Sequence, residues 1–137
     1  MISTSANKEA AAKELGAHHF VVSKDEAQMK SIFHSFDFVL DTVSADHDIN
    51  PYLAILKTNG TYINLGLPPK PWEISSFSVI AGNKAITGSG VGGLQETQDM
   101  LDFCAEHNIV SDIELIDMKD INTAFDRLKK GDVRYRF

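Results

Sequence analysis

The strongest strand signal in the chain is Phe36-Asp37-Phe38-Val39-Leu40-Asp41-Thr42-Val43, which is nearly continuous in apolar and β-branched residues. Parallel strands that are covered on both faces have this composition, whereas strands with one wet face alternate apolar and polar residues. The run therefore predicts a central strand of a parallel sheet.

Strand and helix signals alternate on both sides of this run. Upstream, the sequence predicts a helix over 6–15 that ends at Gly16, a strand over 20–23 and a helix over 25–33. Downstream, it predicts a helix from Asn50-Pro51 to Asn59-Gly60, strands over 61–66, 84–87 and 113–116, and helices over 75–81, 94–107 and 120–130. This alternation indicates an open α/β sheet of parallel strands joined by right-handed crossovers.

Composition limits the class of protein. The 137 residues suggest a single domain over 1–137, with 43% hydrophobic and 23% charged residues, as in ordinary globular proteins. A net charge of -6 without a basic stripe argues against nucleic acid or an anionic membrane as a partner. No apolar run of about 18 residues and no signal peptide are recognisable, so we expect a cytoplasmic protein. Cys104, the single cysteine, is expected to be a small buried filler.

A dinucleotide-binding pattern, G-x-G-x-x-G, stands at Gly88-Ser89-Gly90-Val91-Gly92-Gly93. A predicted strand precedes it and a predicted helix follows, which is the context that the pattern requires. In a true fingerprint, however, the glycines open the nucleotide-binding domain, whereas here about two thirds of the chain comes first. One reading is an independent nucleotide-binding module in which Gly88, Gly90 and Gly93 form a pyrophosphate turn and Glu114 binds the ribose.

Ligands of open α/β sheets bind at the carboxyl ends of the strands. Here those ends are Ser3-Thr4-Ser5, Asp41-Thr42-Val43, Leu65-Gly66-Leu67 and Gly88-Ser89-Gly90. The four segments define one candidate site. Asp41 and Asp46 flank it, but the sequence positions no proton donor against them. The five histidines lack the spacing of metal ligands and are expected to be surface or packing residues. We therefore assign no catalytic residue and no metal ligand.

Several segments together resemble the zinc-dependent medium-chain alcohol dehydrogenases, in particular the cinnamyl alcohol dehydrogenase branch. The segments that carry the resemblance are Ile2 to Lys8, Asp41-Thr42-Val43, Gly60 to Pro68, Ile86-Thr87-Gly88-Ser89, Glu96 to His107 and Asp132-Val133-Arg134-Tyr135-Arg136-Phe137. The resemblance covers essentially the whole chain. It implies an NADP(H)-dependent enzyme that interconverts primary alcohols and aldehydes.

The family also implies which residues bind NADP(H). Ser3, Thr4, Ser5 and Lys8 correspond to a corner that binds the 2'-phosphate, because hydroxyls and an ammonium donate charge-assisted hydrogen bonds to it. The alternative is a helix cap followed by a solvated lysine. The remaining matches are Thr42 and Val43 near the adenosine and nicotinamide crevice, Leu65, Gly66 and Leu67 alongside the nicotinamide ring, Gly88, Ser89, Gly90 and Val91 in a nicotinamide-facing loop, and Arg136, with Arg134 as its competitor, on a cofactor phosphate. The glycine at position 66 is expected to admit the flat ring.

The chain resembles only the later part of the family's Rossmann domain. The first strand, the phosphate-binding glycine turn and the zinc domain have no counterpart here, so the fold expected is an incomplete Rossmann-type sheet and zinc belongs to the missing catalytic domain. In the family's strand order, a gap should separate strand 20–23 from strand 36–43. We expect either rearrangement at that gap or repair by strand exchange.

Two functions from different classes follow. The first is the NADP(H)-binding portion of an alcohol dehydrogenase, inactive as an isolated fragment, that forms a homodimer through edge strand 84–87. The second is a non-catalytic dimerisation or assembly module derived from such an enzyme.

Overall fold

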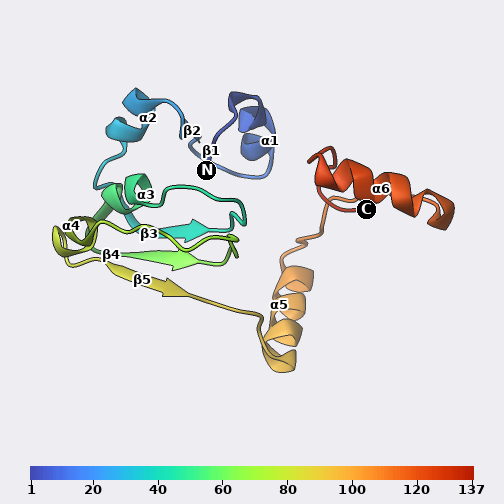
Figure 1. The fold of residues 1–137 in the computed structure, drawn as a ribbon. Helices are drawn as coiled ribbons and strands as arrows, with labels where there is room; N and C mark the ends of the chain where they lie inside the picture. Colours follow the sequence, from blue (N-terminus) through green and yellow to red (C-terminus); the bar gives the residue numbers. More distant parts are fainter. The chain divides into compact units, whose positions relative to one another are not determined.

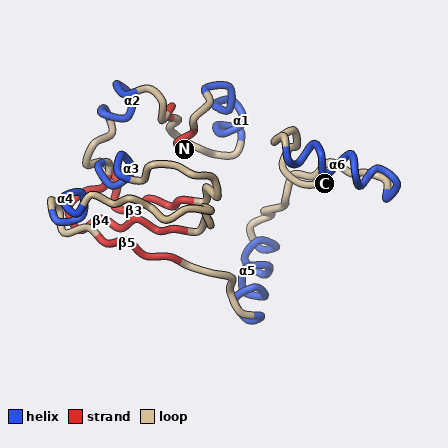
Figure 2. Tube along the Cα trace, in the orientation of Figure 1, coloured by secondary structure: helices blue, strands red, loops and turns tan.

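The computed structural model describes residues 1–137, which form two compact units, Met1–Gly90 and Val91–Phe137 (Figure 1). All five strands belong to the first unit (Figure 2). None of the helices is long and apolar enough to cross a membrane.

The first unit contains two parallel sheets. β1 (Ile2–Ser3) pairs with β2 (Val21–Val22) in the smaller sheet. β3 (Phe36–Asp41), β4 (Leu56–Asn64) and β5 (Ala85–Gly88) form the larger sheet in the order β3-β4-β5. The mixed α/β fold with parallel strands that the sequence predicts is confirmed.

A break separates the two sheets, as the sequence predicts for the region beside strand 36–43. A cavity of about 510 Å³ lies at this break, with Met1 and Ile2 on one side and residues of β3 on the other. The predicted repair by strand exchange stays a prediction.

The expectation that the strand at residues 36–43 is central is wrong. β4 is the central strand of its sheet, and β3 has a strand partner on one edge only. Phe38 and Leu40 are two residues apart on β3 and therefore lie on the same face of the strand. They are 62% and 63% exposed. The sequence pattern indicates covering on both faces, but within this unit packing covers only the opposite face.

The covered face packs against α3 (Asn50–Ala54). Its core consists of four side chains that are 0–1% exposed, namely Ile49, Leu53, Leu56 and Tyr62. A second cluster of Val21, Met29 and Ile55 joins the smaller sheet to the same region, with Tyr52 packed against both clusters. The short helix therefore connects the two sheets.

The predicted helix to Asn59-Gly60 is too long, since α3 ends at Ala54. Leu56 already pairs with Phe36, and the pairing register shifts before Phe38 pairs with Thr61. Asn59 has a φ of 62° inside β4, and its N–H donates to the carbonyl oxygen of Gly82 at 2.8 Å. The Asn-Gly pair thus marks an irregular part of a strand, where left-handed backbone is tolerated, rather than the end of a helix.

The remaining helices of the first unit agree with the sequence in position. They are η1 (Ala6–Lys8), α1 (Glu9–Glu14), α2 (Glu26–Ser31) and α4 (Ser76–Ile80). Asp25 caps α2, because its carboxylate accepts from the N–H groups of Ala27 and Gln28.

The second unit contains α5 (Leu94–Glu106), η2 (Met118–Asp120) and α6 (Ile121–Lys129). Residues 113–116, which were predicted to form a strand, do not form one. Only an isolated parallel bridge joins Ile113 to Arg136. β-branched residues at these positions raise strand propensity, but a strand also requires a partner along its length.

Candidate functional site

The carboxyl ends of β3, β4 and β5 lie side by side. The pairing register aligns Asp41 with Asn64 and Asn64 with Gly88, so the residues that follow leave the sheet at one edge. The Leu65 and Gly66 N–H groups both donate to the carbonyl oxygen of Asp41, at 2.7 and 3.0 Å. Ser89 N–H donates to the Asn64 carbonyl oxygen at 3.1 Å. Three of the four predicted segments therefore meet.

Gly66 is buried against the backbone of Val43. A Cβ atom at position 66 would stand 2.2 Å from the carbonyl oxygen of Val43 and 2.6 Å from its carbonyl carbon. The close approach that excludes a side chain at position 66 is thus made by protein backbone. The clash gives a structural reason for the glycine, and the expectation that position 66 also admits a flat cofactor ring stays a prediction.

The Asp41 side chain is 7% exposed and accepts three hydrogen bonds. Val43 N–H donates to Oδ1 at 2.9 Å, and both the Tyr62 hydroxyl and His47 Nε2 contact Oδ2, the histidine at 2.8 Å. Burial, followed by the hydrogen bond and the negative charge of Asp41, raises the pKa of Tyr62. The phenol therefore remains a donor to this carboxylate.

This network is the part of the site that the sequence analysis missed. We expected no proton donor near Asp41 and a surface or packing role for His47, and the first expectation is wrong. A signal was available, because Asp41 follows Val39 by two residues and so shares the face of β3 that packs into the core. A carboxylate on a buried face requires hydrogen-bond donors.

The Ser3-Thr4-Ser5 corner begins at the last residue of β1. Ser5 N–H donates to Ser3 Oγ at 3.4 Å, and the backbone then enters η1 without a side-chain cap at Ser5. Lys8 is exposed and has no carboxylate within ion-pair distance, whereas Lys13 pairs with Glu9 at 2.7 Å. The corner thus presents hydroxyls and an available ammonium. No hydrogen bond joins it to the ends of β3, β4 or β5.

The glycine pattern at 88–93 belongs to both units. Gly88 ends β5, and Gly93 is the N-cap of α5. The Gly93 N–H, which a pyrophosphate turn would direct at its ligand, already donates to Glu96 Oε2 at 2.7 Å. A carboxylate at this position disfavours a second anion through like-charge repulsion. Gly90 and Val91 are exposed.

Glu114, the ribose ligand of that alternative, has other partners in the second unit. Its carboxylate accepts from Arg127 Nη2 at 2.7 Å and from the Arg134 N–H at 3.1 Å. The first of these contacts is the main reason why the pKa of Glu114 lies below its ordinary value. Arg136 has an exposed side chain, and its carbonyl oxygen accepts from Glu114 N–H at 2.8 Å.

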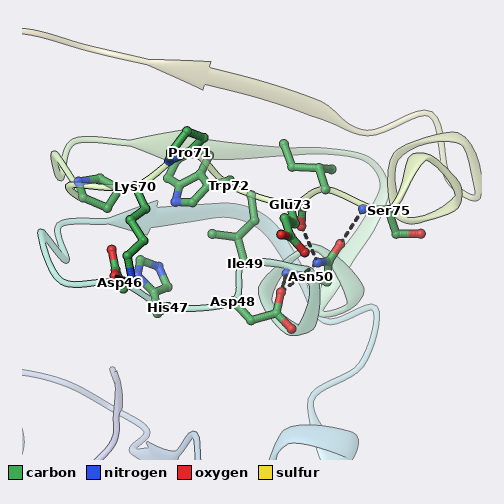
Figure 3. A pocket seen from close by; sticks show the side chains of 12 residues that line it. Asp46, His47, Asp48, Ile49, Asn50, Lys70, Pro71, Trp72, Glu73 and Ser75 are labelled. Carbon is green, nitrogen blue, oxygen red and sulfur yellow. Dashed lines mark hydrogen bonds and ion pairs between the residues drawn. The ribbon is translucent and has the colours of Figure 1, made fainter.

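Another cavity, of about 790 Å³, lies between the loop that follows β3 and the loop that follows β4 (Figure 3). Asn50 joins the two loops, since its Nδ2 donates to the Glu73 carbonyl oxygen and its Oδ1 accepts from Ser75 N–H, both at 2.9 Å. Lys70 and Asp46 form an ion pair at 2.7 Å on the cavity wall. The buried Trp72 Nε1 has no hydrogen-bond partner.

Metal ligands do not assemble in this chain. No group of three or more His, Cys, Asp or Glu side chains is placed to hold an ion. The residues present therefore do not fit a zinc centre, and we derive no chemical step through one.

Comparison with known proteins gives a consistent family match. The family model described as "Zinc-binding dehydrogenase" matches residues 1–106. The chain is 54% identical to a probable mannitol dehydrogenase of Medicago sativa, over 100% of this chain and 38% of that protein. It is also 54% identical to probable cinnamyl alcohol dehydrogenase 6 of Arabidopsis thaliana, over 98% of this chain and 37% of the relative.

Comparison with solved structures gives the same family. A cinnamyl alcohol dehydrogenase from Sorghum bicolor superposes with a TM-score of 0.93 at 46% identity, covering 98% of this chain and 38% of that one. A cinnamyl alcohol dehydrogenase from Helicobacter pylori, solved in complex with NADP(H), gives 0.82 at 34% identity with the same coverage. The chain thus spans about 38% of the length of these relatives.

Proposed function

The chain belongs to the zinc-binding dehydrogenase family, and from this premise we propose that it is the NADP(H)-binding portion of an alcohol dehydrogenase. The observation that carries the proposal is the joining of three strand ends through the backbone carbonyls of Asp41 and Asn64, which produces the edge where parallel sheets bind ligands. The NADP(H) complex of the 34% identical Helicobacter pylori protein supports the choice of cofactor. The whole protein, on this proposal, interconverts primary alcohols and aldehydes.

Each proposed contact is assigned to one part of the cofactor. Ser3, Thr4, Ser5 and Lys8 bind the 2'-phosphate, for which an unpaired ammonium and nearby hydroxyls are suitable donors. The other contacts are proposed for Thr42 and Val43 near the adenosine and nicotinamide crevice, for Leu65, Gly66, Leu67, Gly88, Ser89, Gly90 and Val91 beside the nicotinamide, and for Arg136 at a phosphate. When bound, the nicotinamide supplies the redox chemistry that converts alcohol to aldehyde.

Gly66 contributes to this site through the backbone. Because no side chain separates positions 66 and 43, the backbones of the segments after β3 and β4 lie in contact there. A flat ring can approach the backbone more closely at a glycine than at any other residue.

A calorimetric titration of the 137-residue chain tests the proposal. NADPH should bind more tightly than NADH, and Lys8→Glu should weaken NADPH binding by about tenfold or more, because one charge-assisted hydrogen bond is worth about 1.5 kcal/mol or more. Lys130→Glu, which makes the same charge change at an exposed lysine of the second unit, is the control. Absence of NADPH binding, or equal affinity for NADH, contradicts the proposal.

The same titration addresses the glycine-turn alternative. If Gly88, Gly90 and Gly93 held the pyrophosphate and Glu114 the ribose, Lys8→Glu would leave the affinity unchanged. The hydrogen bond from Gly93 N–H to Glu96 and the pairing of Glu114 with Arg127 argue against this alternative.

We propose further that residues 1–137 form one cofactor-binding domain that does not reduce aldehydes by itself. The family match supports the single domain because it runs through residue 106 and so crosses from the first unit into the second. Incubation of the purified chain with NADPH and cinnamaldehyde should give no consumption of NADPH above that of a blank. Measurable turnover would show this part of the proposal to be wrong.

The second candidate is an assembly role at the free edge of β5. β5 pairs with β4 on one side only, and Ala85 and Thr87 are exposed. An unpaired parallel edge favours association with a second copy. Sedimentation at micromolar concentration should report a homodimer, and a monomer at all concentrations would contradict it. A dimer without NADPH affinity would favour a purely assembly function.

A further inference from the structure

One carboxylate holds both ends of the turn that follows β3. Asp41 Oδ1 accepts from the Val43 N–H at 2.9 Å, and Asp41 Oδ2 contacts His47 Nε2 at 2.8 Å. The segment between Thr42 and His47 therefore begins and ends on the same side chain. Its conformation depends on both contacts.

Both ring nitrogens of His47 face oxygen atoms. Nδ1 lies 2.8 Å from the Ala45 carbonyl oxygen, and Nε2 lies 2.8 Å from Asp41 Oδ2. A carbonyl oxygen only accepts, and a neutral imidazole has one N–H donor, whereas an imidazolium has two. The geometry thus matches a ring with protons on both nitrogens.

The charge of the site favours the same state. Asp41 is 7% exposed, and no lysine or arginine lies within ion-pair distance of it. Its other donors, the Tyr62 hydroxyl and the Val43 N–H, are neutral. A buried carboxylate without a counter-charge is costly, so an imidazolium at position 47 stabilises it.

The other titratable groups around His47 come from each neighbouring element. Tyr62 of β4 shares Asp41 Oδ2, and Tyr52 of α3 meets the imidazole edge-on, with ring centroids 6.0 Å apart. Four exposed charged residues line the same cavity as His47 (Figure 3), namely Asp46, Asp48, Lys70 and Glu73. Lys70 is paired with Asp46, and the Met1 amino group donates to the His19 carbonyl oxygen.

We infer that His47 is a positioning residue for the cofactor site, whose doubly protonated ring fixes the Thr42–His47 turn and holds Val43 against Gly66. This inference rests on the proposed function, because Val43 and Gly66 are proposed cofactor contacts. Loss of one ring proton removes one of the two ring contacts. The turn then loosens, and cofactor affinity falls.

The test is a titration of the chain with NADP⁺ at pH 6 and at pH 8. Because the phosphate of the ligand titrates near pH 6, the affinity of His47→Gln at each pH is divided by the affinity of His107→Gln, a variant of the exposed histidine that follows the last residue of α5. His47→Gln should bind about tenfold more weakly than this control at pH 6, the effect of losing one charge-assisted contact. At pH 8 the difference between the two should be smaller than at pH 6.

A second measurement uses the unmodified chain without cofactor. The ¹⁵N spectrum of His47 should show both ring nitrogens protonated at pH 6, and the Val43 amide signal should shift as the second proton is lost. If these changes occur but NADP⁺ does not bind at any pH, the proposed function fails and the positioning of the turn stands. If NADP⁺ binds and His47→Gln has the same affinity as the control at both pH values, the inference is overturned. It is also overturned if the Val43 amide signal does not change when His47 loses a ring proton.

Discussion

Lys84 stands directly before β5 and donates its ammonium to the carbonyl oxygen of Leu53 in α3, at 2.6 Å. The residue is 8% exposed and has no carboxylate within ion-pair distance. Its partner lies in the last turn of the helix, where carbonyl groups lack intrahelical donors and cations are favoured. The contact therefore closes the end of α3 and joins it to the far strand of the sheet.

Burial lowers the pKa of Lys84, which predicts a sign for the stability of the chain in alkaline solution. The unfolded chain holds this proton up to about pH 10.4, whereas the folded chain releases it earlier, so stability rises with pH between the two values. Relative to Lys84→Met, the wild-type free energy of unfolding should increase between pH 7 and pH 10. Denaturant titrations at several pH values measure it. Lys24→Met, at an exposed lysine, should show no such slope.

Gly66→Ala should destabilise the first unit by about 3 kcal/mol, because the new methyl group would overlap backbone atoms of Val43 rather than a flexible side chain. Gly90→Ala is the matched control, since a Cβ atom there meets nothing within 4 Å, and its effect should stay within about 0.5 kcal/mol. Thermal and urea unfolding measure both. Equal stability of the two variants would show that the backbone at positions 43 and 66 can separate at little cost.

Tyr62→Phe should cost about 1 to 3 kcal/mol of folding free energy. The ring is 0% exposed, and the substitution keeps its packing against Trp72 but removes one of the three donors to the buried Asp41 carboxylate. Tyr52→Phe, at a partly buried tyrosine, provides the comparison and should change stability by less than about 0.5 kcal/mol. A loss for Tyr52→Phe as large as that for Tyr62→Phe would contradict the assignment of the loss to the Asp41 contact.

Glu114→Gln should make the stability of the second unit less sensitive to acid. Arg127 and the Arg134 N–H lower the pKa of Glu114 in the folded chain. The stability that this carboxylate contributes is therefore complete above its unfolded pKa of about 4.3 and is lost as the pH falls through the lower folded value. Circular dichroism during acid titration should show a shallower loss of helix for Glu114→Gln than for the wild type. Glu106→Gln, at an exposed glutamate of α5, should follow the wild type.

Local sequence signals located most of the elements. Helices at 6–15, 25–33, 75–81, 94–107 and 120–130 occur near the predicted positions, because cap residues and helix formers act within a few residues along the chain. The exceptions involve contacts between distant segments. β4 begins at Leu56 because Phe36 supplies its partner, and 113–116 forms only a bridge because Arg136 alone pairs with it.

In the candidate site, too, local signals were readable from the sequence and contacts between distant segments were not. The alternation of strands and helices was enough to predict that ligand-facing segments follow strand ends, and the residues quoted above were enough to indicate the family. Residue order did not reveal that Asp41 is buried, that His47 and Tyr62 meet on one of its oxygen atoms, or that the backbone of Val43 explains the glycine at position 66.

By itself, then, the sequence determined the parallel α/β fold, the family and the strand-end edge that we propose as the ligand site, since all three depend on local propensity and on the order of segments. Only the tertiary structure decided the edge position of β3, the break beside it and the Asp41 network. These features arise from strand pairing and from burial of polar atoms, which depend on how residues far apart in the chain meet in space.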